Sequence, residues 1–221
     1  MQDVVEALEN ELALRRKQYE AVRERLIDGA AAGAECKTLG GISHYSKERC
    51  DATSITREQY VCVESLLQNK AGRTLAASVP QSGGLVAFRS GDILIGNIRP
   101  YLRKIWFSDC DGGTNGDVLV IVANNRKEIE PRFLFHALLS ERFFIHSVSG
   151  MKEGKMPRGD KATIMKYSIP IPPLPVQEEI AKKLDAFDEL VNVALPAEIA
   201  ARRRAMEAVR GRCFAALEAA G

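Results

Sequence analysis

One segment occurs twice in this chain, once near each end. Residues 8–27 and 195–214 align without a gap, and ten of the twenty positions are identical. In both copies apolar residues recur at alternating spacings of four and three, which is the seam pattern of a coiled coil, and Arg15 and Arg202 interrupt the two stripes at the same step. Two ordinary amphipathic helices of similar composition are the alternative, but this many identities in register favour a duplication. The sequence therefore predicts a helix, a globular insert and a related helix, in that order.

A proline-rich stretch leads into the second copy of the repeat. Four of the six residues from 170 to 175 are proline, and each fixes φ and disfavours the α region in the residue before it, so we expect extended backbone. A long helix should follow Pro175, with Glu178 and Glu179 in its first turn, where the helix dipole favours negative charge. Pro196 should kink or restart that helix. The apolar residues expected to pack between the terminal helices are Leu8, Leu12, Tyr19, Val22, Leu26, Ile180, Leu184, Phe187, Val191, Ile199, Met206 and Val209.

The sequence between the repeats predicts an α+β domain. Short β-branched or aromatic runs bounded by Gly, Asp or Asn indicate a mixed, mainly antiparallel sheet. The runs are residues 60–64, 85–88, 93–95, 104–107 and 118–122. Apolar residues at helical spacing predict a helix from Pro131 to Ser147.

The predicted fold is thus one mixed-sheet domain between long terminal helices that form a coiled-coil spacer. We place the first helix at residues 1–29, the globular domain at 30–170, and the proline-rich strap with the second helix at 171–221.

Charge is distributed unevenly over these parts. The globular stretch has nineteen basic and fourteen acidic residues, whereas basic residues are outnumbered seven to five in residues 1–29 and eight to seven in residues 171–221. A basic domain on slightly acidic helices suits a DNA-facing module held by helices that contact protein. Many enzymes share such an imbalance, so this signal is weak on its own.

Composition excludes several other classes of protein. No apolar run is long enough to cross a bilayer and the N-terminus has no secretory pattern, so we expect a cytoplasmic protein without membrane association. Five cysteines without a C-x-x-C pair indicate neither a zinc site nor a disulfide framework.

Several motifs, in order along the chain, resemble one known family. The helical segment from Leu14 to Leu26, the strand–turn–strand from Gly91 to Trp106, the strand from Gly113 to Val120, the loop from Lys155 to Lys161 and the proline-rich strap all take part. Together they resemble the specificity subunit of type I restriction-modification enzymes. Full-length members carry two target recognition domains and two conserved helical regions. This chain has one recognition domain, so it resembles a half-length form.

The resemblance implies a function and a set of partners. It implies recognition of a bipartite target in double-stranded DNA, without catalysis by this chain and without a metal or cofactor of its own. Modification subunits that bind S-adenosylmethionine, and restriction subunits that use ATP and Mg²⁺, would be its partners. We expect two identical chains to associate through the apolar stripes and to read an interrupted palindrome, its gap set by helix length.

Two basic segments are candidates for DNA contact. Arginine reads guanine and asparagine reads adenine through paired hydrogen bonds, whereas lysine mainly meets phosphate. The first segment is a turn with Asn97, Arg99, Tyr101, Arg103 and Lys104. The second is a glycine-rich loop with Lys152, Lys155, Arg158 and Lys161. A solvated turn and a surface loop without function are the alternatives.

Other functions also fit parts of the sequence. Glu153 and Lys155, with an aspartate at 109, 111 or 117, outline a metal-dependent DNA endonuclease, in which carboxylates hold Mg²⁺. Such an outline arises by chance in many chains, so we assign no catalytic residues. A standalone DNA-binding protein and a helical adaptor with an inert central domain are the remaining alternatives.

Overall fold

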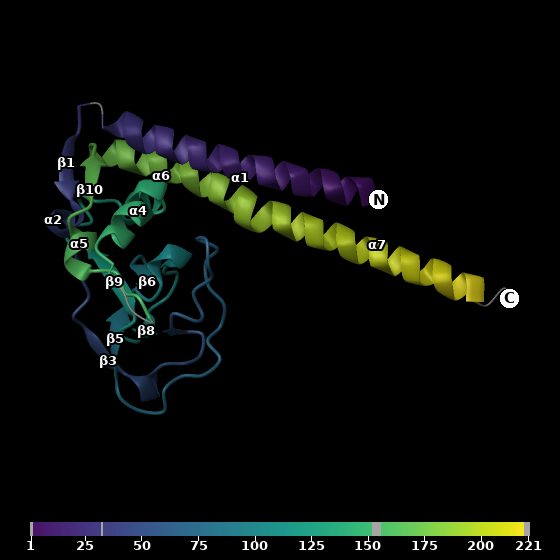
Figure 1. Ribbon diagram of the computed structural model, residues 1–221, viewed down its shortest axis with the longest axis horizontal. Coiled ribbons are helices and arrows are strands. Elements are labelled where there is room, and N and C mark those ends of the chain that lie inside the picture. The colour runs from purple at the N-terminus through teal and green to yellow at the C-terminus, as the bar shows by residue number, and fades with distance from the viewer. Residues whose placement is uncertain (1, 32, 152–155, 219–221) are drawn as a thin grey trace. The chain divides into compact units, whose positions relative to one another are not determined.

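The computed structural model describes residues 2–31, 33–151 and 156–218, which divide into two units (Figure 1). A helical unit comprises residues 1–25 and 182–221, and a globular unit comprises residues 26–181. The globular unit extends beyond the expected span of 30–170 at both ends, because the end of the first helix and the start of the last long helix pack with it. The two units are described separately below.

Two long antiparallel helices form the helical unit. Helix α1 (Gln2–Ala30) lies alongside α6 (Leu174–Glu189) and α7 (Leu195–Glu218), as Figure 1 shows. The Tyr19 ring stacks on Phe187 with 6.3 Å between centroids, and farther along Glu9 is paired with Arg203. Within this unit Tyr19, Leu184, Val191 and Ile199 are buried.

The remaining positions of the expected stripe are covered to different degrees. Leu8, Leu12, Val22, Phe187, Met206 and Val209 are partly exposed in the helical unit. In the globular unit Ile180 is buried and Leu26 is partly exposed. The two helices thus face one another along the apolar stripe within one chain.

The structure shows where the second long helix begins and where it is interrupted. Helix α6 begins at Leu174, so Pro175 lies in its first turn, where a missing N–H costs nothing. Glu178 and Glu179 therefore lie in the second turn, and their expected place in the first turn is wrong. The interruption expected at Pro196 is a five-residue π-helical segment, Leu190–Ala194, directly before it. Pro196 donates no hydrogen bond to the preceding turn, which is free to widen.

The globular unit contains two four-stranded sheets and a two-stranded ribbon. One sheet has the order β2 (Ser43–Tyr45), β9 (Val118–Ala123), β6 (Ile93–Gly96) and β7 (Ile105–Phe107), all antiparallel. The other has the order β3 (Arg49–Asp51), β5 (Gly84–Phe88), β8 (Gly112–Thr114) and β4 (Tyr60–Val61), with only the β4–β8 pair parallel. The ribbon pairs β1 (Glu35–Thr38) with β10 (Ser168–Ile171), which is the start of the proline-rich strap.

Buried side chains from both four-stranded sheets meet in a shared hydrophobic cluster. Phe88 of β5 meets Trp106 of β7 edge to face at 6.0 Å between centroids, and Leu94 and Val120 pack in the same cluster. Glycine is required beside this core at position 112, where a Cβ would lie 2.0 Å from the Gln59 carbonyl oxygen. The predicted mixed, mainly antiparallel pairing is confirmed, but the strands form separate sheets rather than one.

Short helices connect the strands. These are α2 (Leu39–Ile42), α3 (Pro131–Leu138), α4 (Glu141–Ser149), α5 (Lys161–Met165) and the 3₁₀ turns Ala52–Ser54 and Pro100–Leu102. The single helix expected from Pro131 to Ser147 is two helices, because the Ser140 hydroxyl caps α4 by accepting the Phe143 N–H at 3.2 Å. The strand expected at 60–64 stops at Val61, where Ser65 turns the chain by bonding the Cys62 N–H and carbonyl.

Candidate DNA interface

The structure brings the two predicted basic segments together. Ile98 and Arg158 form an antiparallel bridge, although they are sixty residues apart in the chain. The Arg99 N–H donates to the Pro157 carbonyl at 2.8 Å, and the Gly159 N–H donates to the Asn97 carbonyl at 3.2 Å. These backbone bonds join the turn after β6 to the segment before α5. One surface therefore carries residues that sequence reasoning assigned to two separate sites.

The turn after β6 holds two arginines in the left-handed region. Arg99 has φ 50° and Arg103 has φ 53°, on either side of the 3₁₀ turn Pro100–Leu102. Each such residue costs on the order of 1 kcal/mol, so the surrounding structure must hold the turn. Hydrogen bonds from the Asn69 and Lys70 N–H groups to the carbonyls of residues 102 and 103 do so. The turn presents Tyr101 to solvent, where 51% of it is exposed.

Arg158 is exposed and paired with an acidic residue. Its Nε and Nη2 donate to Oδ1 of Asp117 at 3.2 and 2.9 Å. Asp117 lies just before β9, and its backbone carbonyl accepts the Asn97 N–H at 2.8 Å. The turn after β6, the start of β9 and the Arg158 segment therefore meet at one place.

Three of the predicted contact residues are buried or already bonded within the chain. Asn97 is only 5% exposed, so its side chain lies beneath the surface rather than on it. Lys104 turns inward, and its Nζ donates a hydrogen bond to the Val63 carbonyl. Its ammonium group is therefore not free to contact phosphate. Arg103 is partly buried and paired with Glu141, so its charge is largely balanced.

The other predicted lysines have different outcomes. Lys161 is exposed at the start of α5, and its ammonium lies 5.8 Å from the centre of the Tyr45 ring. The Tyr45 hydroxyl donates to the Lys161 carbonyl at 3.1 Å, and burial, followed by the charge of Asp160, raises the pKa of that hydroxyl. Lys152 and Lys155 lie outside the described residues. Arg99, Tyr101, Arg158 and Lys161 are therefore the predicted contact residues that the structure shows on the surface.

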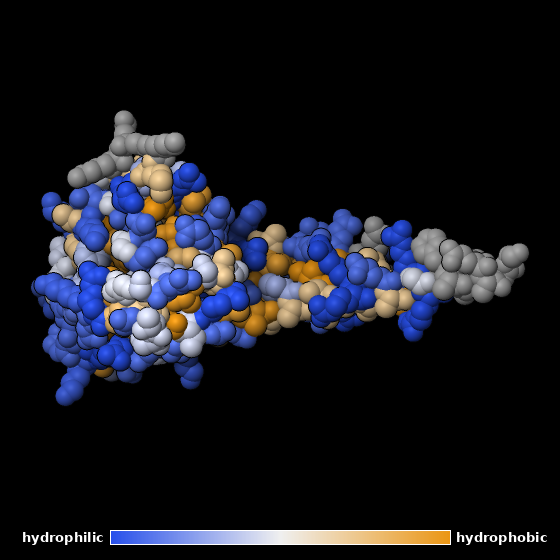
Figure 2. Space-filling view, turned by 90° about the horizontal axis from the view of Figure 1, so that it is seen from below, coloured by the Kyte–Doolittle hydropathy of each residue, from blue (hydrophilic) through white to orange (hydrophobic). Residues whose placement is uncertain are grey.

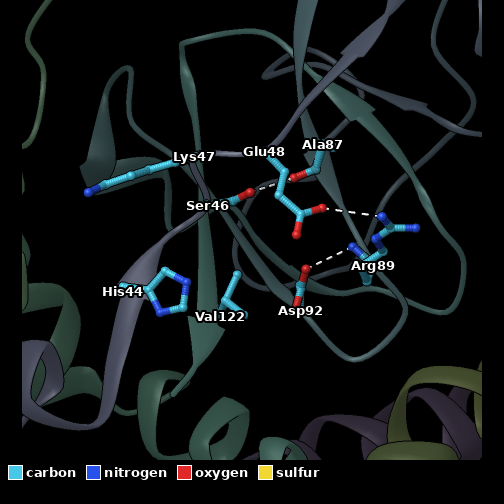
Figure 3. A pocket seen from close by; sticks show the side chains of 8 residues that line it. All are labelled: His44, Ser46, Lys47, Glu48, Ala87, Arg89, Asp92 and Val122. Atoms are coloured by element: carbon cyan, nitrogen blue, oxygen red, sulfur yellow. Dashed lines mark hydrogen bonds and ion pairs between the residues drawn. The ribbon is translucent and has the colours of Figure 1, made fainter. Parts of the chain in front are cut away.

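A charged pocket that sequence reasoning missed lies between the two sheets (Figure 3). Its volume is about 270 Å³, and its lining residues are His44, Ser46, Lys47, Glu48, Ala87, Arg89, Asp92 and Val122. The buried carboxylate of Asp92 accepts the Arg89 N–H at 2.7 Å, and desolvation raises the pKa of Asp92. The Arg89 side chain pairs with Glu48 and Asp111, each at 3.2 Å. Asp92 thus holds the turn between β5 and β6, a role that the sequence signals only by the neighbouring Gly91.

The aspartates of the endonuclease outline are each paired with an arginine. Asp109 pairs with Arg73, Asp111 with Arg89, and Asp117 with Arg158. Among the described residues, no group of three or more His, Cys, Asp or Glu side chains is arranged to hold a metal ion. Within the same residues, no helix has the length and apolar character needed to span a bilayer. Glu153 lies outside the described residues.

Comparison with known proteins identifies the family of this chain. Residues 33–201, about three quarters of the chain, match the model of the type I restriction modification DNA specificity domain. The chain belongs to this family.

Its relatives are specificity subunits. The chain is similar to the EcoDI specificity subunit of Escherichia coli, with 29% identity over 115 residues, 49% of this chain and 25% of that protein. It is also similar to the EcoR124I/EcoR124II specificity subunit of E. coli, with 24% identity over 92% of this chain and 54% of that protein. The crystal structure of the HsdS subunit from Thermoanaerobacter tengcongensis superimposes with a TM-score of 0.57 and 26% identity, over 78% of this chain and 46% of the other. The chain thus spans about half, or less, of the length of these relatives.

Proposed function

We propose that this chain recognises a specific DNA sequence for a type I restriction-modification assembly. The observation that carries the proposal is the family match over residues 33–201, which covers nearly all of the globular unit and its exposed basic surface. Arg99, Arg158 and Lys161 supply cations suited to phosphate and base contact on that surface. Recognition, not chemistry, is the activity of the chain itself.

The partners follow from the same proposal. Modification subunits with S-adenosylmethionine would methylate the DNA that this chain selects, and restriction subunits with ATP and Mg²⁺ would cleave it. The specificity subunit is the non-catalytic member of such an assembly.

A homodimer is part of the proposed function. Association of two copies would bring together two recognition domains, which could then read two half-sites. Figure 2 shows apolar side chains among the charged ones along the helical unit. Val4, Leu14 and Val193 are 45%, 56% and 51% exposed there, and they offer apolar surface to a second copy. An isologous pair with a two-fold axis is the commonest arrangement for identical chains.

Selection from a pool of randomised DNA duplexes tests the proposed function. The full purified chain, alone and with modification subunits, is incubated with the pool, and the retained DNA is sequenced. We expect one enriched motif and no cleavage when Mg²⁺ is added. Retention without an enriched motif would contradict sequence recognition, and Mg²⁺-dependent cutting by the purified chain would support an endonuclease instead.

A further inference from the structure

The ion pair between Arg158 and Asp117 lies on the surface where the two basic segments meet. Side chains of the pair are 52% and 36% exposed, so DNA can reach both. Both arginine donors in the pair converge on a single carboxylate oxygen, Oδ1 of Asp117. Two donors on one acceptor restrict the rotation of the guanidinium plane, which a single bond would leave free.

The backbone on both sides of this pair is fixed. The Asp117 N–H donates to Oδ1 of Asn115 at 3.1 Å, and the Asp117 carbonyl accepts the Asn97 N–H. Arg158 is held by its bridge to Ile98. The carboxylate and the guanidinium therefore start from fixed positions, and the direction of the arginine side chain is set before DNA arrives. Such preorganisation reduces the entropy lost on binding.

The geometry also leaves one edge of the guanidinium open. Every hydrogen bond that Arg158 makes within the described residues uses Nε or Nη2, so Nη1 and the second hydrogen of Nη2 point away from Asp117. The edge that carries Nη1 and Nη2 is one that can pair with O6 and N7 of guanine in the major groove. Arginine held by a carboxylate at its Nε side is thus presented for bidentate reading of a base.

Asp117 has a second effect through its charge. Phosphate attracts arginine whatever the DNA sequence, and this attraction provides nearly all non-specific binding. A carboxylate beside Arg158 offsets that attraction and repels phosphate. Arg99 differs, since its exposed side chain forms no ion pair within the described residues and keeps its full charge for the DNA backbone.

We propose that Asp117 is a positioning residue for specificity, which aims Arg158 at a guanine and lowers its affinity for phosphate. The inference rests on the proposed function, because it assigns roles within the same DNA-binding surface. It predicts that loss of Asp117 makes the chain bind DNA more tightly overall but less selectively.

Three variants of the full chain test this assignment. Asp117→Ala removes the carboxylate, Arg158→Lys keeps the positive charge but cannot pair bidentately, and Asp109→Ala is the matched control. Asp109 is 75% exposed and also paired with an arginine, but it lies outside the bridged segments. Each variant is incubated with randomised DNA duplexes, the retained DNA is sequenced, and the salt dependence of binding is measured after thermal melting has shown intact folding.

We expect Asp117→Ala and Arg158→Lys to lose preference for guanine at the same motif position, by on the order of tenfold. Asp117→Ala should also steepen the slope of log K against log salt by up to about 0.9, whereas Arg158→Lys should leave the slope unchanged. Asp109→Ala should match the wild type in both measurements. A wild-type motif in either Asp117→Ala or Arg158→Lys, or an equally steep slope in Asp109→Ala, would overturn this assignment alone. Failure of the wild-type chain to enrich any motif would overturn the proposed function as well.

Discussion

At Gly159 the two halves of the candidate interface come so close that an added Cβ would require neighbouring side chains to move. A Cβ built there would lie 2.9 Å from Oδ1 of Asn97 and 3.3 Å from Cδ1 of Ile164. The Asn97 oxygen is buried and accepts no hydrogen bond in the described residues, so packing alone keeps it in this position. Glycine at this position is a consequence of packing, not of an unusual backbone angle.

We therefore expect Gly159→Ala to separate the two segments. Forcing a methyl group into this contact should lower the free energy of unfolding by about 1–3 kcal/mol and weaken DNA binding, because Arg99 and Arg158 would lose their relative placement. Gly116→Ala is the control, since no atom lies within 4 Å of the added Cβ. Denaturant unfolding and DNA titration of both variants measure the effect. Equal stability and binding in the two variants would show that the bridge tolerates the extra group.

At the scale of the element, Gln177 connects the start of α6 to the loop before α3. It is fully buried, and its Nε2 donates to the Glu128 and Pro172 carbonyls, each at 2.8 Å. Its Oε1 accepts the Glu130 N–H at 3.0 Å. One amide thus satisfies three backbone groups around the proline-rich strap, which explains how a segment with few N–H donors stays ordered.

Gln177→Glu should be strongly destabilising despite its nearly identical shape. A carboxylate cannot donate to the two carbonyls, and burying its charge with the Glu130 N–H as a backbone donor costs about 3 kcal/mol or more. Gln81→Glu makes the same change at an exposed position and serves as the control. Thermal melting should separate the two variants by several degrees. A melting temperature for Gln177→Glu equal to that of the control would mean that the strap is held by other contacts.

The sequence predicted elements well where the information is local. Helical periodicity located the terminal helices, and β-branched or aromatic runs located five of the ten strands in the described residues. Pro196 marked the interruption of the second helix. These signals all lie within a few residues of one another in the chain. Pairing of β1 with β10 and the contacts of Gln177 depend on residues far apart in sequence, so no local pattern announces them.

The candidate interface shows the same limit. Both basic segments were found from composition, but their bridge through Ile98 and Arg158 was not, since pairing partners are decided by the whole fold. Asn97 and Lys104 have the chemistry of DNA contacts and yet turn inward. Side-chain type alone does not show which face of a turn a residue occupies, so it could not show that these two side chains are directed inward.

For the whole molecule, apolar residues of the helical unit fall into two groups. The buried ones stabilise the fold of the single chain, and the exposed ones are available for association with a second copy. Ile199 is 7% exposed and packs within the chain, whereas Leu14 is 56% exposed. A charge at Ile199 should therefore lower stability by a few kcal/mol. A charge at Leu14 should leave the monomer folded and weaken the proposed dimer.

We expect Leu14→Asp to raise the dimer dissociation constant at least tenfold, about 1.4 kcal/mol, with an unchanged melting transition at low concentration. Leu75→Asp is a matched control, because Leu75 has the same 56% exposure but belongs to the globular unit. Analytical ultracentrifugation over a concentration series measures the constant. Wild-type association by Leu14→Asp would place the dimer contact elsewhere.

The proposed homodimer also determines the symmetry of the DNA target. If two identical chains associate about a two-fold axis, their recognition domains are related by the same axis, whatever the angle between the units of each chain. A two-fold protein binds two identical half-sites in inverted orientation. DNA from cells that carry this chain and its modification subunits should therefore be methylated at an interrupted palindrome with one fixed gap. Sequencing the methylated bases reads this motif directly, and cells without the chain provide the control. Two unlike half-sites would show instead that a second, different recognition domain takes part, and the homodimer would have to be abandoned.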